Sequence, residues 1–431
     1  MRALFWGLLF TVVAIMQPAF AAAVVDGNVQ YTVKKGDTLL SLADRYLNNR
    51  EQYRILQRRN GITNPMALPI GKVLIIDRSL MKYTLSQARI IAVRGQVNAG
   101  GTAARIDQIY SEGARIKTAA ASFVTLQLEN GSKIAIPSNS EVVIRLLRRY
   151  TLGDSIDYDI DLLKGDVSSR VSPLKTRDDR YRVRTPRAVS AVRGTDFQSR
   201  YDPTGNRDFA EVVEGALAVN SGANISETPV AAGNGLSVNA TGAVITEPML
   251  AAPALIDPGK VQADAVLRFA PEPSANASGY RIAMASDAGF QDQIADVSIA
   301  NGVAQFDAIP NGNYFVRTRA ISATGVEGFP TTYAFKRRLN GVTATAGKAD
   351  DGYNFKWTSE GEGIKRFHFQ LYKGYINGVP MVDEAGLTNG LVRISDLPTG
   401  TYFWRVGAAQ YLDGELGMNW TDFEKFVAAG R

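Results

Sequence analysis

The 431-residue chain has no cysteine and a single histidine, His368. Without cysteine there is no disulfide bond, thiolate metal site, cysteine nucleophile or acylated cysteine. One histidine cannot build a histidine-based triad or a histidine-rich zinc site. It alternates with phenylalanines in the run FHFQL at 367–371, which predicts an exposed strand residue. No phosphate loop, cofactor motif or pair of catalytic carboxylates is present either, so we expect a non-enzymatic protein without metal or cofactor.

The chain also has only a small excess of positive charge and few long apolar runs. The net charge of +6, from 48 basic and 42 acidic residues, does not call for a nucleic-acid partner. The only long apolar run lies in the opening MRALFWGLLFTVVAIMQPAFA, where Arg2 precedes an apolar stretch at 3–16 and the small-x-small exit Ala19-Phe20-Ala21. This pattern predicts a signal peptide at 1–21 and an exported, periplasmic protein with no membrane span after cleavage. The alternative is an uncleaved membrane anchor.

The length predicts two to four domains, and the first of them spans residues 29–79. A strand begins at Tyr31, a Gly36-Asp37 turn follows, and Asp37 or Thr38 can cap a helix with an apolar face. A second helix near 50–60 and a strand at 73–77 complete a compact βααβ order. The stretches YTVKKGDTLLSLADRY and NGITNPMALPIGKVLII, at 31–46 and 60–76, resemble a LysM domain.

The resemblance implies binding of N-acetylglucosamine glycans such as peptidoglycan in a shallow groove between two loops. Such a groove offers backbone donors and acceptors to hydroxyl and acetamido groups, and small apolar side chains to the ring faces. The candidate glycan-binding residues are Gly36, Asp37, Thr38 and Leu39 in one loop, and Asn64, Pro65, Ala67, Leu68 and Ile70 in the other. The structural alternative is that Gly36 and Gly71 only form turns and that Leu39 and Ile70 are core.

Residues 84–222 alternate short β-rich runs with turns, and Asn130-Gly131 predicts a hairpin. The strings VRTPRAVSAVRGTDF at 183–197 and EVVEGALAV at 211–219 resemble the FecR domain of bacterial envelope proteins, and we expect a β-roll or stacked sheet. Family members signal through a membrane segment to a cytoplasmic tail. This chain has a leader in front and no later apolar span, which argues against direct signalling across the membrane.

Charged residues of this region have two interpretations each. Asp157, Asp159 and Asp161 alternate on one strand face and predict either a calcium site or ion pairs across a hairpin centred near Gly153. That hairpin would place Arg149 opposite Asp157 and Arg145 opposite Asp161. A basic run could meet an acidic partner, lipid headgroups or wall polymers, or form a solvated strand face; it comprises Arg177, Arg180, Arg182, Arg184 and Arg187.

Two smaller features of the sequence concern turns and connections. Arg193 and Asp196, in VRGTD, are expected to fix a glycine-containing turn through hydrogen bonds. Residues 223–262 are rich in small residues and proline, and predict a linker that includes terminal strands of the preceding domain.

Two similar units follow, at 263–339 and 340–429. The stretch Ile309–Arg317, IPNGNYFVR, repeats as Leu397–Arg405, LPTGTYFWR, and both units resemble fibronectin type III-like β-sandwiches. Their aromatic residues invite a sugar-stacking hypothesis, although alternation turns about half of them inward. These residues are Tyr314, Phe315, Tyr402, Phe403 and Trp404.

The expected fold is therefore multidomain and mostly β: a LysM-like βααβ module, a FecR-like β-roll or sheet, and two fibronectin III/Ig-like β-sandwiches. The expected function is that of an exported adaptor. It would attach to peptidoglycan through residues 29–79 and present its β domains to an envelope protein that the sequence does not identify. The alternative is a periplasmic sensor that acts through the FecR-like domain and a membrane partner.

Overall fold

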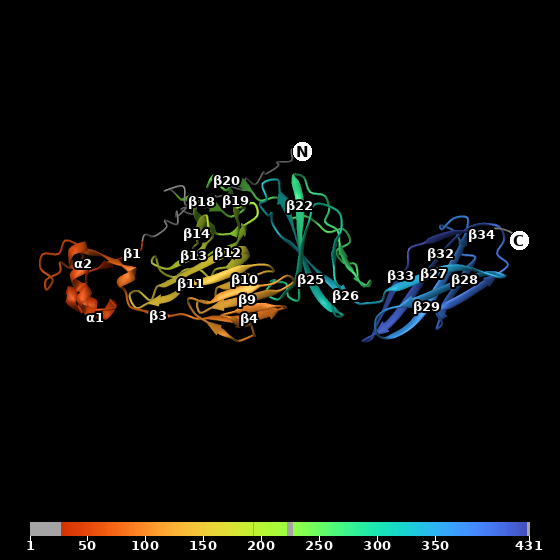
Figure 1. Cartoon of the computed structure of the whole chain (residues 1–431), viewed down its shortest axis with the longest axis horizontal. Coiled ribbons are helices and arrows are strands. Elements are labelled where there is room, and N and C mark those ends of the chain that lie inside the picture. The colour runs from red at the N-terminus through yellow and green to blue at the C-terminus, as the bar shows by residue number, and fades with distance from the viewer. Residues whose placement is uncertain (1–26, 193, 222–226, 429–431) are drawn as a thin grey trace, which may run out of the picture.

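The computed structural model describes residues 27–192, 194–221 and 227–428. Four units follow one another along an elongated molecule, with the N-terminal module at one end and the last sandwich at the other (Figure 1). Within these residues no helix has both the length and the apolarity needed to cross a bilayer. The predicted signal peptide at 1–21 and the turn residue Arg193 lie outside the described residues.

The N-terminal module has the predicted βααβ order. Its two strands pair antiparallel, with Asn28 opposite Asp77 and Thr32 opposite Val73. The helices close the other side of a small core that includes Leu39, Leu42 and Leu56. The elements are β1 Asn28–Thr32, α1 Leu39–Tyr46, the 3₁₀ turn η1 Arg50–Gln52, α2 Tyr53–Arg59, β2 Val73–Asp77 and the 3₁₀ turn η2 Arg78–Leu80.

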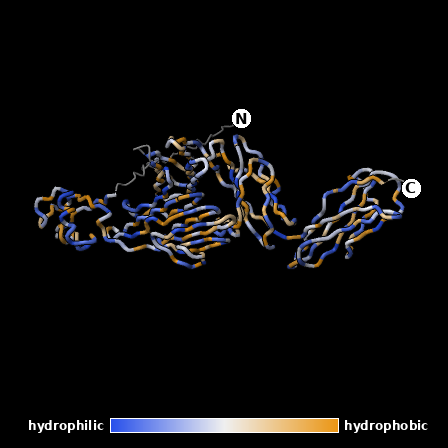
Figure 2. The backbone as a smooth tube through the Cα atoms, viewed as in Figure 1, coloured by the Kyte–Doolittle hydropathy of each residue, from blue (hydrophilic) through white to orange (hydrophobic). Residues whose placement is uncertain are grey.

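The central domain is built from strands β3–β20, whose pairings close on themselves. Apolar residues alternate with polar ones along most of these strands (Figure 2), and the apolar set forms one continuous core. The strands are β3 Tyr83–Leu85, β4 Ala88–Arg94, β5 Val97–Ala99, β6 Thr102–Ala103, β7 Ile109–Tyr110, β8 Arg115–Thr118, β9 Phe123–Leu128, β10 Lys133–Ile136, β11 Glu141–Tyr150, β12 Ile156–Arg170, β13 Arg180–Arg184, β14 Ala188–Val192, β15 Asp196–Asp202, β16 Arg207–Glu214, β17 Ala216–Ser221, β18 Thr228–Ala231, β19 Asn234–Val238 and β20 Val244–Pro248.

Strand β12 joins the two sheets of this domain. Its first half pairs with β11 and β13, whereas its second half, from Gly165 onward, pairs with β15 and β10. Gly165 has φ +80° where the strand changes partners, a conformation that favours glycine. Strands β18–β20 also belong to this domain, so the segment predicted as a linker contributes three strands before an extended connection begins.

The predicted aspartate pairing is correct in kind and for the pair Arg145–Asp161, but wrong in register and for Arg149. The hairpin places Arg148, not Arg149, opposite Asp157, because its turn is one residue tighter than a turn centred on Gly153. A shift of one residue in the pairing places side chains that were expected to be neighbours on opposite faces of the sheet. Arg149 instead contacts Asp154 within the turn at 3.2 Å. A bulge between Ile144 and Leu146 leaves Arg145 in a longer pair of 3.8 Å with Asp161.

The main partners of Asp157 and Asp159 come from the basic run. Strand β13 lies parallel to β12 and sets Arg180, Arg182 and Arg184 opposite Asp157, Asp159 and Asp161. Arg182 contacts Asp157 at 3.1 Å and Asp159 at 2.8 Å, and all three of these side chains are buried. The prediction of a solvated strand face is therefore wrong for this part of the run, since its charges neutralise one another within the domain. Asp196 pairs with Arg170 at 3.0 Å.

Asp208, on β16, is a buried carboxyl with no ion pair among the described residues. Its Oδ2 accepts from the Thr185 hydroxyl at 2.7 Å, while its Oδ1 has no partner. Burial raises the pKa of Asp208 from 3.8 to about 6, against the weaker opposing effects of Thr185 and Arg187. The protonated form is thus favoured by folding.

We expect Asp208→Asn to remove one component of the pH dependence of stability. A carboxyl with a raised folded pKa stabilises the fold most below its unfolded value, and this contribution is lost as the pH rises from about 4 to about 6. The free energy of unfolding of the native protein should fall by about 2–3 kcal/mol relative to the variant across this window. Urea unfolding at several pH values measures this, and parallel curves for the two proteins would contradict it.

The last two units are β-sandwiches, as predicted. The first packs the pair β21–β24 against the sheet β23-β22-β25-β26, and the second packs β27-β28-β31 against the sheet formed by β29, β30, β32, β33 and β34. The strands are β21 Leu267–Phe269, β22 Ala277–Ala285, β23 Gln293–Ile299, β24 Ala304–Phe306, β25 Gly312–Ser322, β26 Thr331–Arg337, β27 Val342–Ala349, β28 Gly352–Ser359, β29 Ile364–Lys373, β30 Val382–Leu387, β31 Leu391–Ser395, β32 Gly400–Leu412, β33 Glu415–Trp420 and β34 Glu424–Ala428.

The repeated stretch occupies the same position in both sandwiches, at the start of β25 and of β32. The Tyr314 hydroxyl donates to the Pro310 carbonyl at 3.0 Å, and the Tyr402 hydroxyl donates to the Pro398 carbonyl at 2.7 Å. Tyr402 and Trp404 are core residues. Their rings are therefore closed to a sugar, which rules out the stacking hypothesis at these two positions.

His368 is half-buried rather than exposed. Its ring lies 5.0 Å from that of Trp420, and its Nε2 contacts the Asp383 carboxylate from the neighbouring strand. Alternation correctly placed it on the face opposite Phe369, which is buried. The sequence did not reveal that Trp420, on β33, covers part of that outer face.

Candidate functional site

The two loops predicted to form a glycan site lie side by side in the N-terminal module. The Leu39 N–H, at the start of α1, donates to the Pro65 carbonyl of the second loop at 3.0 Å. At the other end, Val33 exchanges two backbone hydrogen bonds of 2.9 Å with Gly71 and Lys72. Residues about 30 positions apart thus form one surface, called here the two-loop surface, which comprises Gly36–Leu39 and Asn64–Ile70.

Asp37 is the internal brace of the first loop. Its Oδ2 accepts from the Tyr31 hydroxyl at 2.8 Å and from the Lys34 N–H at 2.7 Å, while Oδ1 contacts Arg45. Burial opposes ionisation, but these hydrogen bonds outweigh it and lower the pKa of Asp37. Burial and the bond to Asp37 raise the pKa of Tyr31 to about 12. Asp37 is only 8% exposed, and its carboxylate fixes the conformation of the loop.

The other residues of the first loop shape the backbone. Gly36 adopts φ +87° at the turn and is exposed. Thr38 caps α1: its hydroxyl accepts from the Ser41 N–H at 3.1 Å, and its own N–H donates to the Ser41 hydroxyl at 3.0 Å. Leu39 is fully buried, as the structural alternative proposed. This loop therefore presents backbone groups and a capping threonine rather than long side chains.

The second loop carries the exposed apolar side chains. Ile70 is 69% exposed, so the alternative that placed it in the core is wrong. Met66 is 65% exposed and was not among the predicted site residues. Met66 lies in the same run of mostly apolar residues as Leu68 and Ile70, and this position in the loop was the sequence signal that could have identified it.

The remaining residues of the second loop set its turn. The Asn64 side-chain oxygen accepts from the Met66 N–H at 3.0 Å, and the Ala67 N–H donates to the Asn64 carbonyl. Ala67 is exposed, while Pro65 and Leu68 are half-buried. Exposed methyl-bearing side chains beside a hydrogen-bonded backbone are the chemistry that a pyranose ring with an acetamido group requires.

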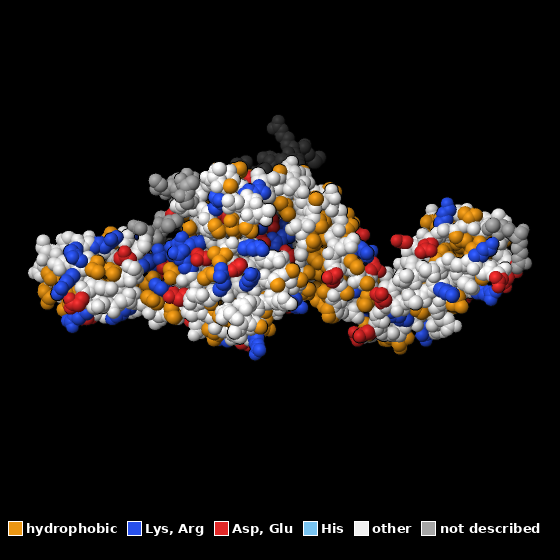
Figure 3. Space-filling model, viewed as in Figure 1, with side chains coloured by type: hydrophobic (Ala, Val, Ile, Leu, Met, Phe, Trp, Pro, Cys, Tyr) orange, Lys and Arg blue, Asp and Glu red, His pale blue; other side chains and the backbone are white. Residues whose placement is uncertain are grey.

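Other features of the module lie outside the two-loop surface. A shallow hollow at the end of α2 contains none of the predicted glycan residues; it is lined by Arg54, Gln57, Arg58, Gly61, Ile62 and Thr63. Lys and Arg side chains also gather on the face shown where the module meets the central domain (Figure 3). Within the described part of the chain, no cluster of three or more His, Asp or Glu side chains could hold a metal ion.

The module is joined to the central domain by a shared core. Tyr150, the last residue of β11, and Leu152, in the turn that follows, pack into the apolar core of the module. The Arg78 guanidinium is buried, donates to the Asp178 carbonyl and lies 5.4 Å from the centre of the Tyr150 ring. The glycan-site module is therefore held directly against the central domain.

Comparison with protein families confirms both local resemblances. Residues 31–77 match the LysM domain, and residues 114–218 match the family described as FecR protein. The chain therefore contains a LysM domain, which implies peptidoglycan binding, and a FecR domain. Both domain types are typically non-catalytic and suggest an extracytoplasmic location in the envelope. No catalytic domain is recognised among these matches.

Comparison with solved structures gives distant similarities. A Parabacteroides distasonis protein assigned as an anti-sigma factor shares 16% identity, with coverage of 31% of this chain and 59% of that chain and a TM-score of 0.26. Chicken CNTN1 domains FN1–FN3 share 13% identity over 57% of this chain and 95% of theirs, with a TM-score of 0.23. The fibronectin(III)-like modules of Clostridium thermocellum CbhA share 12% over 40% and 90%, with a TM-score of 0.19. No curated protein matches the chain.

Proposed function

We propose that this chain, with its LysM and FecR domains, is a non-enzymatic adaptor that binds peptidoglycan in the periplasm and holds its β domains at the cell wall. The observation that carries the proposal is the pairing of the two loops through Leu39 and Pro65, which sets exposed Met66 and Ile70 beside the backbone of the first loop. The ligand would be an N-acetylglucosamine glycan, and many glycan repeats would raise the effective affinity of a weak module. The partner of the β domains would be an envelope protein.

Co-sedimentation with purified peptidoglycan sacculi tests the proposal. We expect the full mature chain to sediment with sacculi, and the double variant Met66→Ala/Ile70→Ala to bind about tenfold or more weakly, because both exposed side chains lose contact area. Leu85→Ala is the matched control, since Leu85 is an exposed apolar residue on β3, outside the module. Equal sedimentation of the double variant and the native chain would contradict the assignment of the two-loop surface.

Point variants are preferable to deletion of the module. Removing residues 31–78 would expose Tyr150 and Leu152, which pack into the module's core, and would disturb the central domain itself.

The supernatant of the co-sedimentation experiment also tests the non-enzymatic part of the proposal. Release of muropeptides by the pure native chain would indicate a hydrolase.

A sensor role is the second candidate function. The buried contacts between the module and the central domain favour it, because a structural change caused by glycan binding would reach β11 and β12 through these contacts. A sensor would transmit this change to a membrane partner, whereas a tether would not need to. Hydrogen exchange with and without N-acetylglucosamine oligomers separates the two: altered protection in β12–β16 supports the sensor, and protection changes confined to residues 27–81 support the tether.

A further inference from the structure

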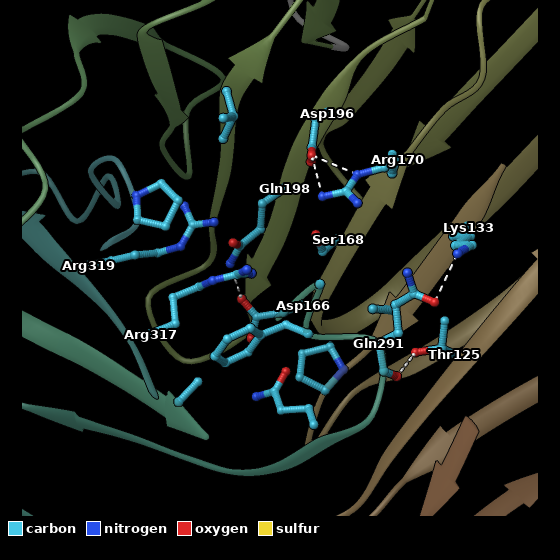
Figure 4. A pocket seen from close by; sticks show the side chains of 18 of the residues that line it. Thr125, Lys133, Asp166, Ser168, Arg170, Asp196, Gln198, Gln291, Arg317 and Arg319 are labelled. Carbon is cyan, nitrogen blue, oxygen red and sulfur yellow. Dashed lines mark hydrogen bonds and ion pairs between the residues drawn. The ribbon is translucent and has the colours of Figure 1, made fainter. Parts of the chain in front are cut away.

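A cavity of about 250 Å³ lies between the central domain and the first sandwich. Figure 4 shows its two walls, with Arg317 and Arg319 on the sandwich side and Lys133, Ser168 and Arg170 on the side of the central domain. It lies in a different part of the molecule from the two-loop surface. Concave sites at domain interfaces that combine apolar side chains with a few polar groups are characteristic of small-ligand binding.

The charges that line this cavity do not balance. Five cationic side chains face three carboxylates: Lys133, Arg170, Arg281, Arg317 and Arg319 against Asp166, Asp196 and Glu327. The carboxylates are already used, because Arg281 contacts Asp166 and Glu327 at 3.0 Å and Arg170 contacts Asp196 at 3.0 Å. Asp296, which is not one of the lining residues, also pairs with Arg281.

Arg319 contacts Glu327 at 3.9 Å, which leaves Lys133 and Arg317 as the two lining cations without an ion pair among the described residues. Of these two, Arg317 is the guanidinium. No described carboxylate lies within ion-pair distance of it; its hydrogen bonds go to the Thr332 hydroxyl at 3.1 Å and to the Ala288 carbonyl at 3.3 Å. Its guanidinium stacks 3.8 Å from the centre of the Phe290 ring. Burial, and then the neighbouring Arg319, lower the pKa of Arg317 to about 10. A fixed, partly desolvated guanidinium of this kind is matched to an anion.

The loop that carries Phe290 is held in a strained conformation at this cavity. Phe290 has φ +56°, which is unfavourable for a bulky residue. Contacts across the domain boundary fix the next residue: the Gln291 carbonyl accepts from the Thr125 hydroxyl at 2.6 Å, and its side chain accepts from the Lys133 ammonium at 2.9 Å. Backbone strain maintained by surrounding contacts is characteristic of ligand sites.

We propose that this cavity binds a small ligand with a single anionic group, a carboxylate or a phosphate, which pairs with Arg317. Ser168 and Gln293 would face the polar body of the ligand, and the Phe290 ring would fix the plane of the guanidinium. One anionic group would reduce the excess of positive charge among the lining residues. Because residues of both walls take part, the ligand would also bind the central domain and the first sandwich together.

Calorimetric titration of the full mature chain with inorganic phosphate, acetate, N-acetylmuramic acid and neutral N-acetylglucosamine tests the proposal. We expect either phosphate or the two carboxylates to bind, and Arg317→Ala to weaken that binding about tenfold or more. Arg405→Ala is the matched control, because Arg405 is stacked in the same way on Trp420 in the other sandwich. Phosphate binding alone would identify a phosphate ligand, and binding of acetate and N-acetylmuramic acid would identify a carboxylate.

A second variant tests the same site without removing the arginine. Ala283 lies directly opposite Arg317 on the neighbouring strand and lines the cavity. Ala283→Asp should supply the missing carboxylate and abolish anion binding while the domain stays folded. The proposal would be overturned if none of the anions binds, or if bound anion is insensitive to both Arg317→Ala and Ala283→Asp. Neither result depends on whether the chain binds sacculi.

Discussion

Arg281→Met is expected to destabilise the boundary between the central domain and the first sandwich by about 3–5 kcal/mol. The Arg281 side chain is 14% exposed and contacts three carboxylates from both domains: Asp166 and Glu327 at 3.0 Å and Asp296 at 2.7 Å. The apolar replacement would leave these carboxylates buried without their common cation. Urea unfolding of the full chain measures the loss, and hydrogen exchange on β12 and β22 identifies the transition that moves.

The same variant should show a pH signature. Burial opposes ionisation of Glu327, but Arg281 and Arg200 outweigh it and lower its pKa to about 2. A carboxyl with a depressed folded pKa stabilises the fold above its unfolded value of 4.5, and that contribution is lost as the pH falls toward 2. The stability difference between native chain and variant should therefore shrink below about pH 4.5.

An exposed arginine provides the control for this network. Arg393 contacts Asp351, but both side chains are about half exposed. Solvent screens such a pair, so Arg393→Met should leave the unfolding transition unchanged within experimental error. If Arg281→Met were as harmless as Arg393→Met, the network would not hold the two domains together.

Gly165→Ala should cost about 3 kcal/mol or more, because it combines two penalties. The residue has φ +80°, where an L side chain costs about 1–2 kcal/mol. An added Cβ would also lie 2.7 Å from the Ser140 Cα and 2.9 Å from the Asn139 carbonyl oxygen, which are backbone atoms that must move. Overpacking of this kind adds about 1–3 kcal/mol. The measurement is urea unfolding of the full chain.

Gly153→Ala separates the two penalties. Gly153 lies in the turn that precedes β12 and has φ +73°, but an added Cβ there would meet nothing within 4 Å. Its substitution should cost only the backbone penalty of about 1–2 kcal/mol. Equal effects of the two variants would mean that the strand accommodates a side chain at the point where it passes from one sheet to the other.

Local features of the chain were readable because their determinants are contiguous. The Gly36-Asp37-Thr38 turn and cap identified the start of α1, and the repeated prolines, glycines and tyrosines located β25 and β32. The ion-pair partners of the charged residues were harder to predict. The tight turn moved the residue opposite Asp157 by one position, and the parallel strand β13 then supplied cations from more than twenty residues away.

The glycan-site prediction has a similar division. The sequence predicted that two loops form one site and identified most of their residues, but it could not assign the role of each residue. Asp37 has a surface-type side chain that proved to be a buried brace, whereas Ile70 has a core-type side chain that proved to be exposed. Whether a loop side chain is buried depends on how the two loops pack against each other, and the sequence pattern does not specify this packing.

The sequence by itself determined the order of the units, the βααβ module, the β-rich character of everything that follows, and the absence of cysteine and histidine chemistry. Tertiary structure alone decided the charge network at the domain boundary, where Asp166 and Arg281 meet across 115 positions, and the cavity beside it. The physical reason is the distance along the chain over which each kind of interaction acts. Capping, turn geometry and hydrophobic alternation act within a few residues, whereas ion pairs and cavities depend on surfaces that meet only after folding.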